Sequence, residues 1–80
     1  MARFDIYVTY KKGIFDPPGA TAERALQNLG YGEVSSVKIG KFIQLEVAED
    51  TSVERVAEMC GKLLANPVIE DFRIEPVEEA

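Results

Sequence analysis

Residues 3–10 alternate between apolar and polar side chains. One face of this segment carries Phe4, Ile6, Val8 and Tyr10. Because side chains in a strand point alternately to its two faces, the pattern predicts a half-buried β-strand. Lys11-Lys12-Gly13 ends the strand, and the turn-forming run Asp16-Pro17-Pro18-Gly19 follows. Asp16 is suited to cap a helix, with Pro17 at the first helical position.

Two later segments have the apolar spacing of amphipathic helices. The first runs from Ala20 to Leu29, and Gly30 is placed to close it in a left-handed conformation. The second opens at residues 50–52, where Thr51 and Glu54 match a capping box. Its apolar positions are Val53, Val56, Ala57, Cys60, Leu63 and Leu64. Asn66 and Pro67 are expected to stop it, with Asn66 in the left-handed conformation.

Residues 34–49 hold a second alternation whose course the pattern leaves open. Five of its apolar residues share odd-numbered positions, namely Val37, Ile39, Ile43, Leu45 and Val47. A two-residue hairpin turn at Gly40-Lys41 would reverse this parity and put Phe42 on the apolar face. The segment is therefore either a hairpin with an odd-numbered loop and a bulge, or one long bent strand at 34–48 whose second half pairs outside its own subunit.

The order of elements predicts an α+β fold. A last strand is expected over Val68–Val77, where Pro76 confines it to a sheet edge, and residues 78–80 are expected to fray. The predicted architecture is a two-layer sandwich, with an antiparallel sheet that carries both helices on one face, as in the ferredoxin-like βαββαβ plan. Residues 1–80 form a single domain. Tyr7 and Phe42 are either core residues or part of a second face that meets water or a partner subunit.

Composition narrows the range of functions. Nine Lys and Arg against fourteen Asp and Glu give a net charge of −5, which disfavours nucleic acid as a partner. No apolar run reaches the length of a membrane span. The chain has no histidine and one cysteine, which removes histidine-dependent nucleophile systems, zinc clusters and internal disulfides. We expect a cytoplasmic protein, without a metal, a cofactor or catalytic residues of its own.

Few side chains are candidates for chemistry. Cys60 is interpreted as a small core residue, because no histidine is present to activate it. The scattered carboxylates are interpreted as solvated, except in Glu70-Asp71, where at least one carboxylate must face away from the packed layer. Five dispersed lysines are interpreted as solvated rather than as an anion patch: Lys11, Lys12, Lys38, Lys41 and Lys62.

Several runs of the chain resemble one known family. They are Gly13-Ile14-Phe15-Asp16-Pro17-Pro18-Gly19, Val37-Lys38-Ile39-Gly40-Lys41 and the stretch from Met59 to Phe72, which contains Leu63-Leu64-Ala65-Asn66-Pro67-Val68-Ile69-Glu70-Asp71. In these runs, and over essentially its whole length, the chain resembles PurS, the small subunit of phosphoribosylformylglycinamidine synthase. Each run alone is weakly specific, and together they are specific.

The resemblance implies a non-catalytic subunit of a purine-biosynthetic ligase. In that family a homodimer or homotetramer holds together a large ligase subunit (PurL) and a glutaminase subunit (PurQ). The complex uses ATP and Mg to convert formylglycinamide ribonucleotide and glutamine to the amidine. The partner-interface candidates in this sequence are Asp16, Pro17, Gly19, Asn66, Glu70 and Asp71. The first three form a rigid turn, and the last two offer a carboxylate to a partner's arginine.

Two other functions fit a small α+β domain. An ACT-like regulatory domain would bind a small molecule at a dimer interface. An RNA-binding sheet of the RRM type would need a basic surface, against which the net charge argues. Association with larger subunits is the property that separates the first of these alternatives from a PurS-like role.

Overall fold

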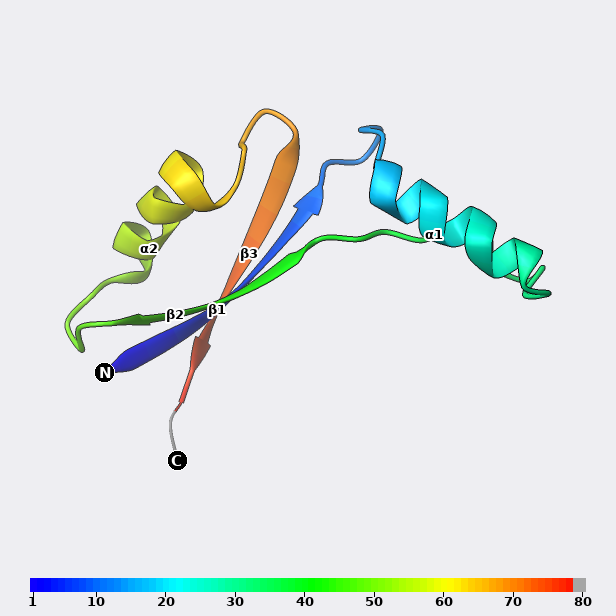
Figure 1. Ribbon diagram of the computed structural model, residues 1–80. Helices are drawn as coiled ribbons and strands as arrows, with labels where there is room; N and C mark the ends of the chain where they lie inside the picture. Colours follow the sequence, from blue (N-terminus) through cyan, green and yellow to red (C-terminus); the bar gives the residue numbers. More distant parts are fainter. Residues whose placement is uncertain (79–80) are drawn as a thin grey trace.

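Three antiparallel strands form the body of the molecule, in a computed structural model that describes residues 1–78 (Figure 1). The strands are β1 (Ala2–Tyr10), β2 (Lys41–Val47) and β3 (Glu70–Val77), and β1 lies in the middle of the sheet order β2-β1-β3. The register places Tyr7 of β1 between Phe42 of β2 and Arg73 of β3. Pro76 therefore lies on an edge strand, as its missing N–H requires.

One face of the sheet is covered by a single helical layer. Helix α2 (Val53–Met59) continues directly into a π-helical turn, η1 (Cys60–Leu64). The core lies between this layer and β1, and its buried residues are Phe4, Ile6, Val8, Val56, Cys60 and Ala65. Half-buried apolar side chains of the outer strands surround this core: Ile43, Leu45, Val47, Phe72 and Ile74. The odd-numbered apolar parity predicted for residues 43–47 is confirmed.

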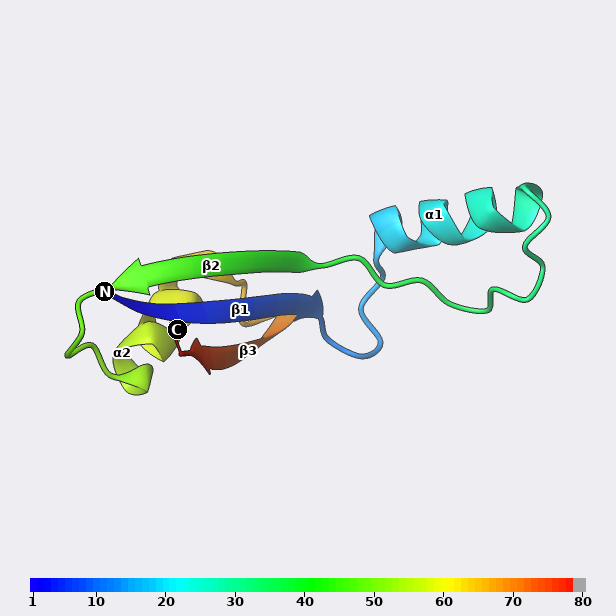
Figure 2. The same ribbon diagram turned by 90° about the horizontal axis from the view of Figure 1, so that it is seen from below.

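Helix α1 (Pro17–Asn28) does not lie on the sheet. It projects from the end of β1, and residues 31–40 return beside it to reach β2 (Figures 1 and 2). We call residues 11–40 the arm. The arm makes the molecule long and thin, with extents of 49 × 32 × 14 Å and a radius of gyration of 16.0 Å. A compact domain of this length has a radius of gyration of about 12 Å.

The α+β class and the antiparallel sheet are confirmed, and two details differ from the expected plan. Only α2 covers the sheet, because the arm carries α1 beyond the end of β1 (Figure 2). The hairpin at Gly40 does not form, and neither does one long strand over 34–48, because the strand begins at Lys41 and pairs with β1 of its own subunit. Gly40 serves a close approach, since a Cβ there would collide with the carbonyl oxygen of Val8.

The ends of the helices also differ in part from expectation. Gly30 has the predicted positive φ, at 104°. Ser52 rather than Thr51 caps α2, and its hydroxyl accepts a bond of 3.1 Å from the Arg55 N–H. Asn66 is not left-handed, since no described residue other than glycine has a positive φ. Residues 78–80 were expected to fray. Glu79 and Ala80 lie outside the described residues, and for Glu78 the fraying stays a prediction.

No helix within residues 1–78 is long and apolar enough to cross a membrane.

Candidate functional site

The six partner-interface candidates fall at the same end of the sheet, in two connections. Asp16, Pro17 and Gly19 lie where β1 passes into α1, and Asn66, Glu70 and Asp71 lie where η1 passes into β3 (Figure 1). Lys11 joins the two connections. Its backbone N–H donates to the Ile69 carbonyl at 2.8 Å, and its ammonium group lies 2.9 Å from Asp71 Oδ1.

Asp16 ties α1 to the returning segment of the arm. One carboxylate oxygen accepts the Gly19 N–H at 3.0 Å, which is the predicted helix cap. The other oxygen accepts the Ile39 N–H at 2.9 Å, across 23 positions of sequence. Both oxygens of this carboxylate therefore bind backbone groups of the arm, and Pro17 stands exposed at the first helical position.

Gly19 is the one buried residue of α1. A Cβ at this position would collide with the Asp16 carboxylate and with the carbonyl oxygen of Val37. The helix and the returning segment therefore meet at a point that admits only glycine. Farther out, the side-chain amide of Gln27 donates to the Val34 carbonyl at 2.9 Å. The arm is thus held together by its own hydrogen bonds, at a distance from the core.

Asn66 and Glu70 hold the second connection in one shape. The Glu70 carboxylate accepts the Asn66 N–H at 2.7 Å, and the Asn66 side-chain oxygen accepts the Val68 N–H at 3.1 Å. The Asn66 carbonyl accepts the N–H groups of Ile69 and Glu70. A role for these polar groups in partner binding stays a prediction, and the structure gives each of them an intramolecular partner.

Beside this connection, two apolar side chains are exposed that the sequence pattern did not predict to be on the surface. Leu63 is 84% exposed and Val68 is 77% exposed, the highest values among the described large hydrophobic residues. We call these two residues the loop patch. Leu63 was expected on the core face, but the π-helical turn closes with a hydrogen bond from Ala65 N–H to the Cys60 carbonyl at 2.8 Å. The wider turn brings Ala65 into the core and turns Leu63 outward.

The other face of the sheet carries an aromatic and charged ladder across all three strands. The Tyr7 and Phe42 rings are 5.1 Å apart, and the Arg73 guanidinium lies 4.5 Å from the centre of the Tyr7 ring. Tyr7 and Phe42 alternate with the core positions of their strands, and Phe42 is 54% exposed, so both rings lie on the face that no helix covers. On the same face, Arg3 Nε and Asp5 Oδ1 are 3.6 Å apart.

Cys60 is fully buried against the sheet, as expected of a core residue. Burial raises the pKa of its thiol above the ordinary value, which keeps the thiol protonated and poorly nucleophilic at neutral pH. Within residues 1–78, no group of His, Cys, Asp and Glu side chains is arranged to hold a metal ion.

Comparison with known proteins identifies the family. The family model described as PurS, phosphoribosylformylglycinamidine (FGAM) synthase, matches residues 3–78. The chain is 44% identical over 81 residues to the FGAM synthase subunit PurS of Bacillus subtilis, covering 99% of this chain and 95% of that protein. It is 41% identical over 78 residues to PurS of Methanocaldococcus jannaschii, covering 94% of each chain.

Solved structures agree with the sequence relatives. A crystal structure of B. subtilis PurS superposes with a TM-score of 0.90 at 42% identity, and covers 98% of this chain and 100% of that one. A structure of PurLQS from Thermotoga maritima contains a chain with a TM-score of 0.79 at 32% identity, which covers 95% and 96%. The matches span nearly the whole chain at 32–44% identity, so the protein belongs to the PurS family, the small subunit of phosphoribosylformylglycinamidine synthase, an enzyme of purine biosynthesis.

Proposed function

We propose that this chain is a non-catalytic assembly subunit that joins the ligase subunit (PurL) and the glutaminase subunit (PurQ) of the synthase. The observation that carries the proposal is its structural similarity to a chain of the PurLQS structure over nearly its full length. The lack of histidine supports the non-catalytic role, because glutaminase chemistry of the Cys-His kind must then reside in another subunit.

Physical proximity gives an assembly subunit its effect on the reaction. Ammonia released from glutamine into water is protonated, and ammonium has no free electron pair with which to attack a substrate. Subunits held together deliver ammonia before this happens, and they replace a bimolecular encounter by a local transfer. In this proposal ATP and Mg serve the ligase subunit, this chain binds no cofactor, and the complex works in the cytoplasm, to which a free, buried thiol is suited.

The loop patch is the best candidate on this chain for contact with a larger subunit. The π-helical turn η1 carries Leu63, and hydrogen bonds at Asn66 and Glu70 fix the connection that carries Val68. Exposed apolar side chains on a rigid backbone bind a partner favourably, because the backbone loses little conformational freedom when the complex forms. The polar candidates of this connection then position the patch, and the apolar pair makes the contact.

A double substitution tests this contact. We expect the double variant Leu63→Ser with Val68→Ser to bind the two larger subunits at least about tenfold more weakly, as measured by co-sedimentation. Each aliphatic side chain buried at an interface contributes roughly 1–2 kcal/mol to binding. The matched control is Val53→Ser, which changes a half-exposed apolar residue, 45% exposed, on the first turn of α2. Assembly of the double variant at wild-type affinity, with the fold intact by circular dichroism, would assign the contact to another surface.

We further propose that the chain acts as a homodimer or homotetramer. Its accessible surface is 5878 Å², whereas a compact protein of this mass exposes about 4,800 Å². The excess, about 1,100 Å², is more than the roughly 800 Å² that each partner buries in a standard interface, so it is large enough to supply one. The arm supplies much of this surface, with exposed Phe15, Leu29 and Tyr31. A second copy of the chain that packs against the arm would bury this excess surface.

A further inference from the structure

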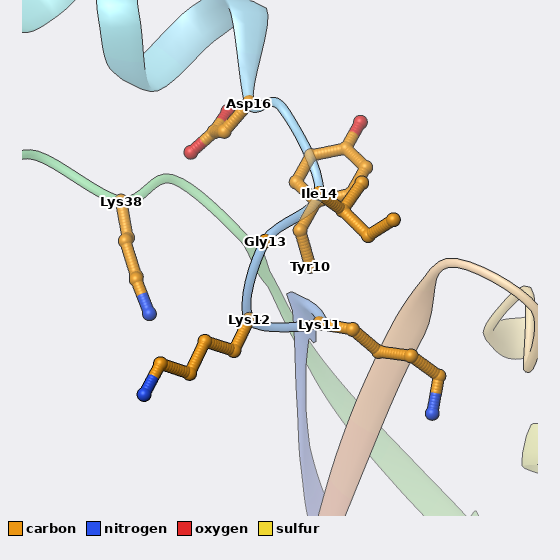
Figure 3. A pocket seen from close by; sticks show the side chains of 7 residues that line it. All are labelled: Tyr10, Lys11, Lys12, Gly13, Ile14, Asp16 and Lys38. Atoms are coloured by element: carbon orange, nitrogen blue, oxygen red, sulfur yellow. The ribbon is translucent and has the colours of Figure 1, made fainter.

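A small recess lies at the base of the arm, between the turn that follows β1 and the returning segment (Figure 3). Its volume is about 140 Å³, and it is lined by Tyr10, Lys11, Lys12, Gly13, Ile14, Asp16 and Lys38. Lys12 and Lys38 are 26 positions apart in sequence, and the fold brings both to one recess. Their ammonium groups point to the same side of the turn, whereas Lys11 points to the other side, towards Asp71 (Figure 3).

Two of the four charged side chains at this recess have partners within the described part of the chain, and two do not. Lys11 is neutralised by Asp71 at 2.9 Å. The Asp16 carboxylate is bound through both oxygens to the N–H groups of Gly19 and Ile39, so its hydrogen-bonding capacity is largely used. Neither Lys12 nor Lys38 makes a hydrogen bond or an ion pair within residues 1–78. The recess therefore keeps two cationic donors in a chain whose net charge is −5.

Size and surroundings limit what these donors can bind. A nucleotide-sized ligand needs a pocket of about 300 Å³ or more, so a recess of 140 Å³ admits one small group. Ile14 and Tyr10 supply its apolar lining, and the exposed Lys12 and Lys38 supply its positive charge. We propose that Lys12 and Lys38 form a binding site for a single oxyanion group, either a phosphate or the carboxylate of an acidic side chain.

The test is a titration of the wild-type protein with sodium phosphate and with sodium acetate, followed by NMR of the backbone amides. Sodium chloride at equal ionic strength provides the reference. We expect saturable shifts at residues 12–16 and at Lys38, with dissociation constants of about a millimolar, as two solvent-accessible ammonium groups allow. Saturable binding of both anions supports a site for an oxyanion group, and phosphate, with its higher charge, should bind the more tightly.

Three variants with the same change in charge decide the assignment. Lys12→Gln and Lys38→Gln should each weaken binding at least about threefold, because each removes one charge-assisted contact. Lys62→Gln, which removes an exposed lysine of η1 outside the recess, should leave binding unchanged. The proposal is overturned if neither anion shifts these amides beyond the chloride reference, or if Lys62→Gln weakens binding as much as the other two variants.

Discussion

Cys60 shows how a residue with chemical potential is used for packing. Its side chain is fully buried beside Val56 and against β1, and burial raises the pKa of its thiol. Cys60→Ala should therefore lower the free energy of unfolding by about 1–2 kcal/mol, since it removes one buried heavy atom and leaves a small cavity. Synthase activity of the assembled complex should be unchanged. Urea unfolding and a turnover assay measure the two effects.

The same pKa shift gives Cys60 a signature in the pH dependence of stability. An unfolded thiol loses its proton near pH 8.5, whereas the buried thiol keeps it to higher pH. The unfolded state then binds fewer protons, so wild-type stability is full below about pH 8.5 and declines as pH rises further. The Cys60→Ala variant should lose less of its free energy of unfolding than the wild type as the pH rises above about 8.5. A variant that declines as steeply as the wild type would contradict the burial of the thiol.

Local residue chemistry could be predicted where one short-range interaction dominates. Asp16 caps a helix and Pro17 starts it, because both roles depend on neighbours in sequence. The second bond of Asp16, to Ile39, could not be predicted, because it joins positions 23 residues apart. Glu70 accepts the Asn66 N–H, a bond that the sequence pattern did not predict, and its role at a partner interface stays a prediction.

At the scale of elements, the start of α2 provides a sharp test. Ser52 caps this helix, and Thr51, the expected cap, lies one position outside it. We predict that Ser52→Ala lowers the free energy of unfolding by about 1 kcal/mol, because the Arg55 N–H then loses its acceptor. Thr51→Ala should cost less than half as much. Thermal unfolding of both variants measures the difference. A larger loss of stability in Thr51→Ala than in Ser52→Ala would indicate instead that Thr51 and Glu54 form a capping box.

The strands were more predictable than the arrangement of the helices. Alternation in residues 3–10 and 43–47 records burial against α2, and the structure confirms both parities. The apolar stripe of α1 indicates that something covers the helix, but a stripe does not say what covers it. The sequence pattern therefore suggested a helix on the sheet, whereas Leu29 is 74% exposed on the arm. The sequence pattern also did not predict the π-helical turn, because the turn leaves the order of apolar residues unchanged.

At the scale of the whole molecule, the arm determines the expected state in solution. β2 is an edge strand, and its outer backbone groups, with exposed Phe42 beside them, offer a place for a second chain. We expect a dimer or a larger assembly at micromolar concentration, because the exposed excess of surface is large enough for a standard interface. Light scattering coupled to gel filtration measures the mass. A monomer of 8.9 kDa at that concentration would contradict this expectation.

Comparison of two activities in a mixture reconstituted from the three subunits tests whether this chain acts by assembly. One assay supplies glutamine as the nitrogen source, and the other supplies an ammonium salt. Omission of this chain should abolish most glutamine-dependent turnover and leave ammonium-dependent turnover much less affected, because the ligase site lies in another chain. Glutamine-dependent turnover that survives without this chain, or hydrolysis of ATP or glutamine by this chain alone, would contradict the account.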